Sequence, residues 1–275
     1  MFRKILAISS FVALAISLAA AADTPRASAN LTAAQIVDKN VSARGGLQAW
    51  RAVQALEMTG KMDAGGNERR TLPVPGVKTG ANMLPRRPAE PVQLPFVMDL
   101  KRGRKMRVEI QFNGQTALQV YDGSKGWKLR PFLNRHEVEA FTPEELQSAA
   151  AQSDLDGPLI DFAAKGSKVE LEGMEQVDGR NAYNLKVADR LGRVRHVWID
   201  AENFLEVKVE GSPRRLDGKY HPVAIYYRDY KSVSGLMMPY LLETTVDGVK
   251  EKEKIQIEKI VLNPKLDEAR FAMPR

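Results

Sequence analysis

The chain has 275 residues, of which 44% are hydrophobic and 27% charged, so its composition is that of a globular protein rather than a disordered one. It has no cysteine, which excludes a disulfide framework, a thiolate metal site, a cysteine nucleophile and an acylated N-terminal cysteine. Its formal net charge is +7, and no HExxH, GxxxxGKS/T or GxGxxG motif occurs, which excludes the common zinc-protease, NTPase and dinucleotide-binding signatures.

The first 22 residues have the features of a secretory signal peptide. Arg3 and Lys4 give a positive start, residues 5–18 are predominantly apolar, and Ala20-Ala21-Ala22 fits the small-residue rule for cleavage before Asp23. The apolar run is shorter than a comfortable bilayer span and ends in alanines, which favours cleavage over a membrane anchor. We therefore predict a cleaved signal peptide over 1–22 and a periplasmic domain over 23–275, and the loss of Arg3 and Lys4 lowers the net charge to +5.

Basic residues cluster within a stretch of 39 residues in the first half of the chain. They include Arg69, Arg70, Arg86, Arg87, Lys101, Arg102, Arg104, Lys105 and Arg107. Two interpretations stay open: a solvated face, or a surface that contacts anionic lipid head groups. We expect no nucleic-acid partner, because the protein is exported.

One helix and then a long series of strands are predicted after the signal peptide. Thr32 and Gln35 form a capping box, and apolar residues at helical spacing continue to Gly45-Gly46, where the helix ends. From there the hydrophobic period is two. Strands are predicted over 53–62, 94–101, 106–112, 115–122, 125–130, 168–177, 180–188, 194–200, 205–210, 222–231, 236–246 and 252–262. Turn signals such as Asp178-Gly179 separate them, which indicates a mostly antiparallel meander.

Two segments interrupt the series of strands. Residues 72–95 hold six prolines, which remove amide donors and favour extended backbone, so this segment is predicted to be a loop. Residues 142–166 are predicted to form two short helices. Thr142-Pro143-Glu144-Glu145 places an N-cap, a first-position proline and an N3 acid in order for the first, and the second runs from Pro158 to Lys165.

The number of strands limits the possible architectures. Eleven strands spaced about 4.8 Å apart would make a sheet about 50 Å wide, and twisted sheets of that size curl or split. We predict a mainly β fold, a curled antiparallel half-barrel of about eleven strands with short helices lidding the concave face. A closed barrel filled by its own side chains and a two-sheet sandwich remain alternatives on periodicity alone. An outer-membrane barrel is excluded, because the second face of many strands carries Lys, Glu, Arg and Gln.

A series of short motifs carries a resemblance to a known family. They are Asp122-Gly123 with Gly126-Trp127, GMEQVDGRNAY over 173–183, HVWID over 196–200, FLEVK over 204–208, Asp229-Tyr230, GLMMP over 235–239, IVLN over 260–263 and FAMP over 271–274. In their order and spacing over 120–275, and more weakly over 30–60, they resemble the periplasmic lipoprotein-localisation factor superfamily (LolA/LolB-like), especially its outer-membrane lipoprotein-sorting-protein branch.

The resemblance implies a lidded half-barrel that binds a lipid-like or acylated ligand without catalysis and without a cofactor. The implied partners are a lipid or acylated protein and components of the inner or outer membrane; the oligomeric state is not predicted. In this family the lipoprotein carrier uses an arginine on an early strand to hold its lid helices, and neither Arg104 nor Arg107 matches that position. The outer-membrane receptor has a cysteine anchor, absent here, and a protruding apolar loop; the Pro-rich segment with Met83-Leu84 is either a counterpart of that loop or a spacer.

The candidate ligand-binding residues combine clean alternation with large apolar side chains. The candidate cavity residues are Met106, Val108, Ile110, Phe112, Leu118, Val120, Trp127, Leu129, Leu205 and Val207, and the candidate lid residues are Leu146, Leu159, Ile160 and Phe162. Methionine suits an adaptable cavity and also fills ordinary cores. Met58, Met62, Met98, Met106, Met174, Met237 and Met238 fall in or beside predicted strands.

Residue types that carry catalysis elsewhere do not form a catalytic pattern in this sequence. Ser124 follows Asp122 and not the glycine that a nucleophile elbow requires. Asp154, Asp156 and Asp161 lack the spacing of a calcium loop and are interpreted as residues that cap and flank helices, so no metal site is predicted. His196 is interpreted as a surface or cavity-rim residue. We predict a non-enzymatic periplasmic carrier or chaperone for lipids or lipoproteins, and the alternative is an envelope-stress sensor or regulatory protein-binding module.

Overall fold

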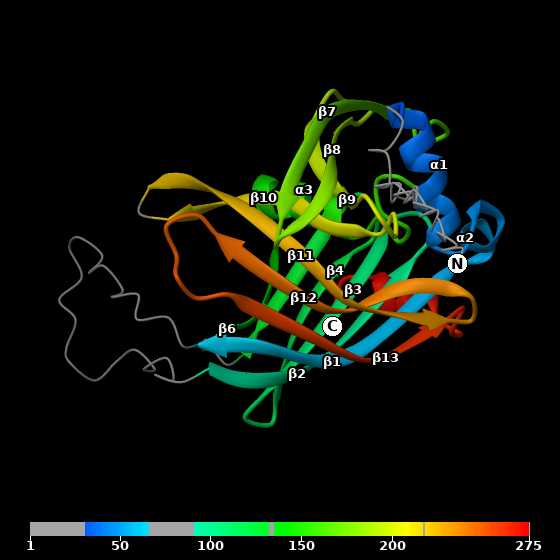
Figure 1. Ribbon diagram of the computed structural model, residues 1–275. Helices are drawn as coiled ribbons and strands as arrows, with labels where there is room; N and C mark the ends of the chain where they lie inside the picture. Colours follow the sequence, from blue (N-terminus) through cyan, green and yellow to red (C-terminus); the bar gives the residue numbers. More distant parts are fainter. Residues whose placement is uncertain (1–30, 66–90, 132–134, 217, 275) are drawn as a thin grey trace, which may run out of the picture. The chain divides into compact units, whose positions relative to one another are not determined.

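The computed structural model describes residues 31–65, 91–131, 135–216 and 218–274, and residues 32–275 form one compact unit (Figure 1). The predicted signal peptide over 1–22 lies outside the described residues. So does most of the predicted Pro-rich loop, including Met83-Leu84. No helix in the part of the chain that the structure describes is both long enough and apolar enough to cross a bilayer.

Two short helices precede the sheet. In α1 (Ala33–Ala43) the predicted capping box is present, with the Thr32 hydroxyl accepting from the N–H of Gln35 and the Gln35 side chain accepting from the N–H of Thr32. Gly45 follows with φ 107°, and a Cβ there would lie 2.4 Å from the carbonyl oxygen of Gly235, so only glycine fits. Helix α2 (Leu47–Ala52) buries Trp50.

Thirteen strands form one antiparallel sheet in the described residues. They are β1 (Ala55–Gly65), β2 (Pro91–Lys101), β3 (Lys105–Phe112), β4 (Gln115–Tyr121), β5 (Gly126–Arg130), β6 (Arg135–Ala140), β7 (Lys168–Val177), β8 (Arg180–Ala188), β9 (Val194–Asp200), β10 (Glu206–Leu216), β11 (Lys219–Val233), β12 (Leu236–Val246) and β13 (Glu253–Leu262). Strand β6 was not predicted, because Val138 is the only large apolar residue in it and the alternation is too weak to detect.

Strand β2 begins at Pro91, so residues 91–95 are strand and not part of the predicted Pro-rich loop. They pair only with β1, since the described pairing with β3 starts at Phe96. Proline has no backbone N–H, but this loses no hydrogen bond to a neighbouring strand where that side of the strand has no neighbour. Pro91 and Pro95 are therefore tolerated at this end of β2.

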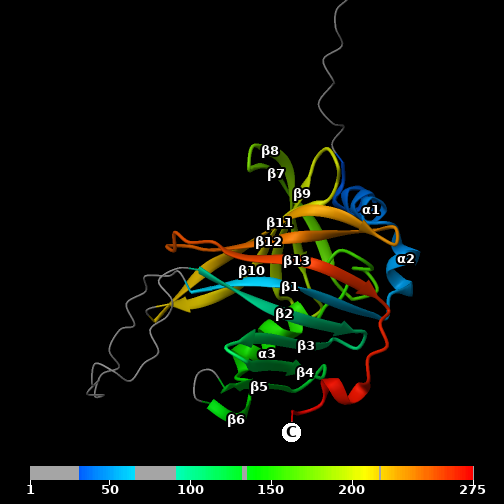
Figure 2. The same ribbon diagram turned by 90° about the horizontal axis from the view of Figure 1, so that it is seen from below.

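The strand order places the two ends of the sequence side by side in the middle of the sheet. The order is β6-β5-β4-β3-β2-β1-β13-β12-β11-β10-β9-β8-β7, so β6 and β7 are the two open edges (Figure 2). The sheet does not close on itself, which confirms the curled half-barrel over the closed barrel. Because consecutive strands β6 and β7 lie at opposite edges, the chain between them must cross the sheet. That crossing segment is the predicted lid.

The first predicted lid helix is confirmed and the second is wrong. Helix α3 (Pro143–Gln152) has the expected capping box between Thr142 and Glu145. The following segment, residues 153–167, which we call the lid turn, is a series of turns instead of a helix from Pro158 to Lys165. Asp161 has φ 56°, in the left-handed region that an α-helix excludes.

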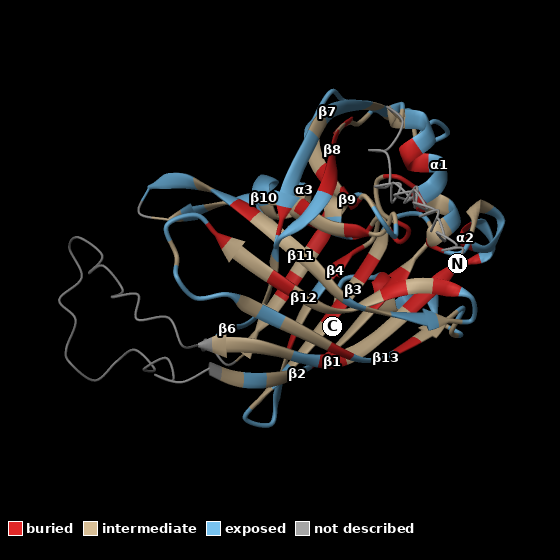
Figure 3. Ribbon diagram, viewed as in Figure 1, coloured by how far each residue is buried: buried red, intermediate tan, exposed pale blue. Residues whose placement is uncertain are grey.

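The C-terminal strap, residues 263–274, covers the side of β2 and β3 that faces away from the lid. Its 3-10 helix η2 (Glu268–Phe271) places the Arg270 guanidinium 2.5 Å from Oδ2 of the fully buried Asp99. Phe271 is buried as well. Inner strands such as β3 and β12 consist mostly of buried and half-buried residues, whereas the edge strand β7 is mostly exposed (Figure 3).

We expect the ion pairs of Glu268 in the strap to persist below pH 4.5 and to be lost only as the pH approaches about 2. Hydrogen bonds from Lys101 and Lys105 lower the pKa of Glu268 from 4.5 to about 2. Because the folded-state pKa is depressed, the stabilisation is fully present above pH 4.5 and is lost as the pH falls toward about 2. An NMR titration of the Glu268 carboxyl should give this low midpoint, and the double variant Lys101→Met/Lys105→Met should return it toward 4.5. An ordinary midpoint in the unmodified protein would contradict the contact.

Candidate functional site

The strand register assigns each residue of β2–β5 to one of two faces. Met106 pairs with Leu100 on β2 and with Tyr121 on β4, and all three belong to the apolar cluster that includes Ala149 of α3. These residues define the inner face, under the lid. Arg107, one position along, pairs with Asp99 and so lies on the outer face, under the strap.

The register divides the predicted cavity residues between the two faces. Met106, Val108 and Ile110 lie on the inner face and belong to, or pack against, the cluster under the lid. Phe112 has the same phase in β3. In contrast, Leu118, Val120, Trp127 and Leu129 lie on the outer face, because Leu118 pairs with Glu109 and Leu129, and Val120 pairs with Arg107 and Trp127.

Two further predicted cavity residues are not brought to this cluster. Leu205 precedes β10, and Val207 lies at a register shift between Glu206 and Lys208. Neither belongs to the cluster as the described residues define it. Three methionines that the sequence could assign neither to the core nor to the cavity do lie at this cluster. Met58, Met62 and Met98, from β1 and β2, are half-buried and pack against it.

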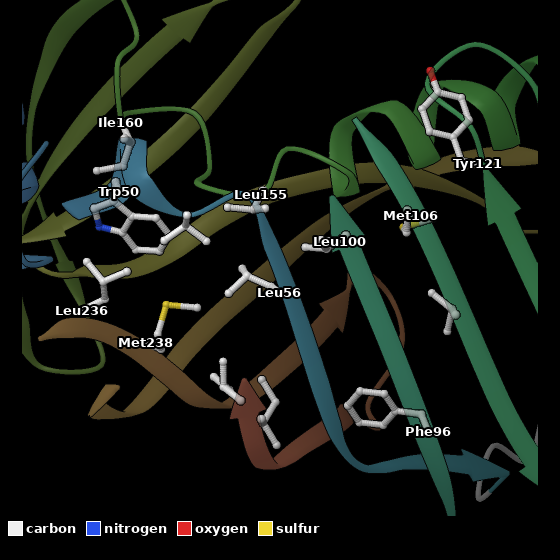
Figure 4. Packing of buried hydrophobic residues seen from close by; sticks show 14 of the residues in the cluster. Trp50, Leu56, Phe96, Leu100, Met106, Tyr121, Leu155, Ile160, Leu236 and Met238 are labelled. Atoms are coloured by element: carbon white, nitrogen blue, oxygen red, sulfur yellow. The ribbon is translucent and has the colours of Figure 1, made fainter. Parts of the chain in front are cut away.

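The lid residues meet the inner face at its buried end. Ile160 of the lid turn packs in the cluster with Trp50, Leu155, Leu236 and Met238 (Figure 4). Leu159 is fully buried too, and Leu146 and Phe162 are half-buried, with Leu146 packed against the cluster. This end of the half-barrel is therefore filled by protein side chains.

Buried charges fasten the lid turn to the rest of the fold. Asp156, 2% exposed, accepts from the Arg102 guanidinium at 2.6 Å through Oδ2 and from the Lys165 ammonium through Oδ1, while its carbonyl accepts from Arg44 at 3.0 Å. Burial alone would raise the pKa of Asp156, but Lys165 and Arg102 outweigh it and the pKa lies below its usual value. Arg102, in the turn between β2 and β3, thus binds the lid turn together with Arg44 and Lys165.

The same network extends to β10 and β11. Nη1 of Arg44 also donates to the buried Glu206 carboxylate at 3.0 Å, and the Tyr230 hydroxyl donates to the Glu206 side chain. Burial and the Glu206 charge raise the pKa of Tyr230 well above its ordinary value. An exposed pair, Arg51 with Asp161, closes the outer side of the lid turn at 2.7 Å. The three acidic residues 154, 156 and 161 therefore bind basic side chains of this chain.

A small pocket lies between α3 and the inner face. It measures about 150 Å³ and is lined by Met106, Gln119, Lys128, Arg130, Phe141, Glu145, Ser148, Ala149 and Gln152. Lys128 donates to both oxygens of Glu145 at 2.5 Å. Burial alone would raise the pKa of Glu145, but the hydrogen bonds from Lys128 and Thr142 outweigh it and the pKa is lowered. Ligand pockets usually measure about 300–1,000 Å³, so this one is smaller than a typical ligand pocket.

A second, larger groove of about 560 Å³ lies along β8–β12. His196, Trp198, Lys208 and Glu210 form one wall of it. The Lys208 ammonium sits 3.5 Å from the centre of the Trp198 indole, and Nδ1 of His196 lies 2.6 Å from Glu210. These groups already pair with one another. Among the described residues no group of three His, Asp or Glu side chains is arranged to hold a metal ion.

Comparison with known proteins places this geometry in a fold family. No family model and no curated protein matches the chain. Among solved structures, a LolA superfamily protein from Nitrosomonas europaea superposes with a TM-score of 0.53 at 14% identity, over 87% of this chain and 97% of that one. A putative outer membrane lipoprotein-sorting protein domain from Vibrio parahaemolyticus gives 0.52 at 11% identity, over 86% and 94%. The chain therefore has the fold of the LolA superfamily, as its sequence motifs indicate.

Proposed function

We propose that the protein is an exported, non-catalytic carrier or chaperone that takes up an acyl chain of a lipid or lipoprotein on the inner face of its half-barrel. One observation carries the proposal. Half-buried apolar side chains, among them Met58, Met98 and Ile110, lie on the inner face beside a cluster that α3 covers with small residues, Ala149 and Ala150. The fold it shares with a lipoprotein-sorting domain supports the same reading.

The energies favour exchange of the lid helix for an acyl chain. Helix α3 contributes Leu146, Ala149 and Ala150 to the apolar contact; full burial of one leucine and two alanines is worth about 4 kcal/mol, and Leu146 and Ala150 are only half-buried, so the contact is worth less. A long acyl chain gains about 0.8 kcal/mol per methylene, or roughly 10 kcal/mol in total. The closed pocket is too small for such a chain, so uptake requires α3 to move away from the sheet. Flexible methionines let the same surface accept either partner.

Native mass spectrometry and probe binding test the proposal together. Protein purified without detergent is expected to carry lipid or acylated adducts that organic extraction removes. The extracted protein is then expected to bind a neutral fluorescent apolar probe, and added acyl ligands should displace it. Absence of both adducts and probe uptake would refute acyl binding.

The alternative that the sequence raises is a sensor module for envelope stress, and it stays a prediction. Affinity capture from envelope extracts separates the two. Recovery of acylated proteins or lipids would favour carriage, whereas recovery of a transmembrane regulator would favour sensing.

A further inference from the structure

Lys128 is a buried cation on the inner face. It lies on β5 opposite Gln119, which pairs in turn with Val108 of the inner face, and it is 7% exposed. Its ammonium donates to both carboxylate oxygens of Glu145 at 2.5 Å, and the next carboxylate, of Glu139, is 3.9 Å away. The close counter-charge of Lys128 is therefore carried by the lid helix and not by the sheet.

This arrangement has a consequence for lid movement. When α3 leaves the sheet, Glu145 leaves with it, because Glu145 is the N3 residue of that helix. An acyl chain that then covers Lys128 would leave a buried cation without its partner, which is unfavourable. An anionic group of the entering ligand, placed where the Glu145 carboxylate was, would remove that cost. The lid carboxylate and a ligand anion thus compete for one ammonium.

The surroundings of Lys128 fit an anionic head group. Arg130 also lines the pocket: its Nη2 donates to Glu139 at 2.7 Å, while its Nε is buried without a hydrogen-bond partner among the described residues. Gln119, Ser148 and Gln152 add polar groups. The opposite side of the pocket is apolar, with Met106, Phe141 and Ala149. A polar end that adjoins an apolar surface matches an amphiphile.

We propose that Lys128, with Arg130, is the head-group subsite of the inner face and selects acyl ligands that carry a phosphate or carboxylate. The proposal rests on the acyl-binding function above. It also assigns Glu145 a second role: in the closed protein its carboxylate occupies the position of the ligand anion.

Three ligands with the same chain length test the subsite: dodecyl phosphate, dodecanoate and neutral monolauroylglycerol. Each is titrated at pH 8 into the extracted full chain carrying a neutral fluorescent probe, and displacement of the probe gives its affinity. The unmodified protein is expected to bind at least one anion 10-fold or more tightly than monolauroylglycerol. In Lys128→Met the anions should bind no more tightly than monolauroylglycerol. Lys128→Arg and the exposed-lysine control Lys125→Met should keep the preference. Comparison of the two anions identifies the head group.

Glu145→Gln provides an independent check that does not depend on the folding of the Lys128 variants. Loss of the carboxylate that must otherwise separate from Lys128 should raise the affinity for all three ligands several-fold and keep the preference for the anions. Equal binding of all three ligands by the unmodified protein, or an anion preference that survives Lys128→Met, would overturn the subsite and leave acyl binding intact. Failure of every ligand to displace the probe would overturn acyl binding and the subsite with it.

Discussion

Replacement of Asp156 with asparagine is expected to lower the free energy of unfolding by about 3 kcal/mol. The Asp156 side chain is almost fully buried and accepts from both Arg102 and Lys165. The substitution keeps the size of the side chain but removes the charge, which leaves two cations facing an amide. Arg102 is one-third exposed, so water recovers part of the loss. Urea denaturation followed by circular dichroism measures the change.

A second acid of the lid turn supplies the matched control. Asp161 pairs with Arg51 at 2.7 Å, but the Arg51 side chain is 48% exposed. Exposed pairs are worth about 0–1 kcal/mol, so Asp161→Asn should cost less than 1 kcal/mol. Asparagine also tolerates the left-handed backbone at this position. Equal losses in the two variants would show that the buried network does not hold the lid turn.

Replacement of Ile110 with arginine is expected to weaken acyl binding at least 30-fold. Ile110 lies on the inner face and packs half-buried against the cluster, where the proposed acyl chain would lie. A charge facing the chain keeps its water or must be desolvated, and a loss of about 2 kcal/mol corresponds to about 30-fold in affinity. Probe binding to extracted protein measures the effect.

The control for this variant is Leu118→Arg. Leu118 lies on the adjacent strand, is half-buried like Ile110, and belongs to the outer face because it pairs with Glu109. Its substitution should leave probe affinity within two-fold. Far-ultraviolet circular dichroism and melting temperatures establish that both variants fold. If the two substitutions weakened binding equally, the assignment of the faces would be contradicted.

Alternation in the sequence predicts strands well and assigns their faces less well. Twelve strands could be predicted because apolar and polar residues alternate along them. In β3, for example, Met106, Val108 and Ile110 alternate with polar neighbours, which is typical of a strand whose two faces differ in burial. Strand β4 is buried on both faces, since the strap covers the side of the sheet on which Val120 lies. Apolar residues therefore occur there in both phases, and the period alone cannot tell which phase faces the lid.

The lid turn illustrates the other limit of sequence reasoning. The apolar spacing of Leu159, Ile160 and Phe162 resembles a helix, but long-range hydrogen bonds and the backbone at Asp161 impose turns. The basic partners of Asp156 come from positions as distant as Arg44 and Arg102. Nothing local in the sequence signals such partners. The strand order does explain why the segment between β6 and β7 crosses the sheet, because these two strands are its opposite edges.

Methionine-methyl NMR tests the central claim most directly, because some methionines of the chain lie at the inner cluster and others are exposed to solvent away from it. Met58, Met62, Met98, Met106 and Met238 belong to, or pack against, the inner cluster, whereas Met174 and Met273 are 48% and 56% exposed. Titration of methyl-labelled protein with a deuterated acyl ligand should shift the inner methyl resonances, and a protonated ligand should give nuclear Overhauser contacts to them. Shifts and contacts confined to Met174 and Met273, or no response from any methyl group, would contradict uptake on the inner face.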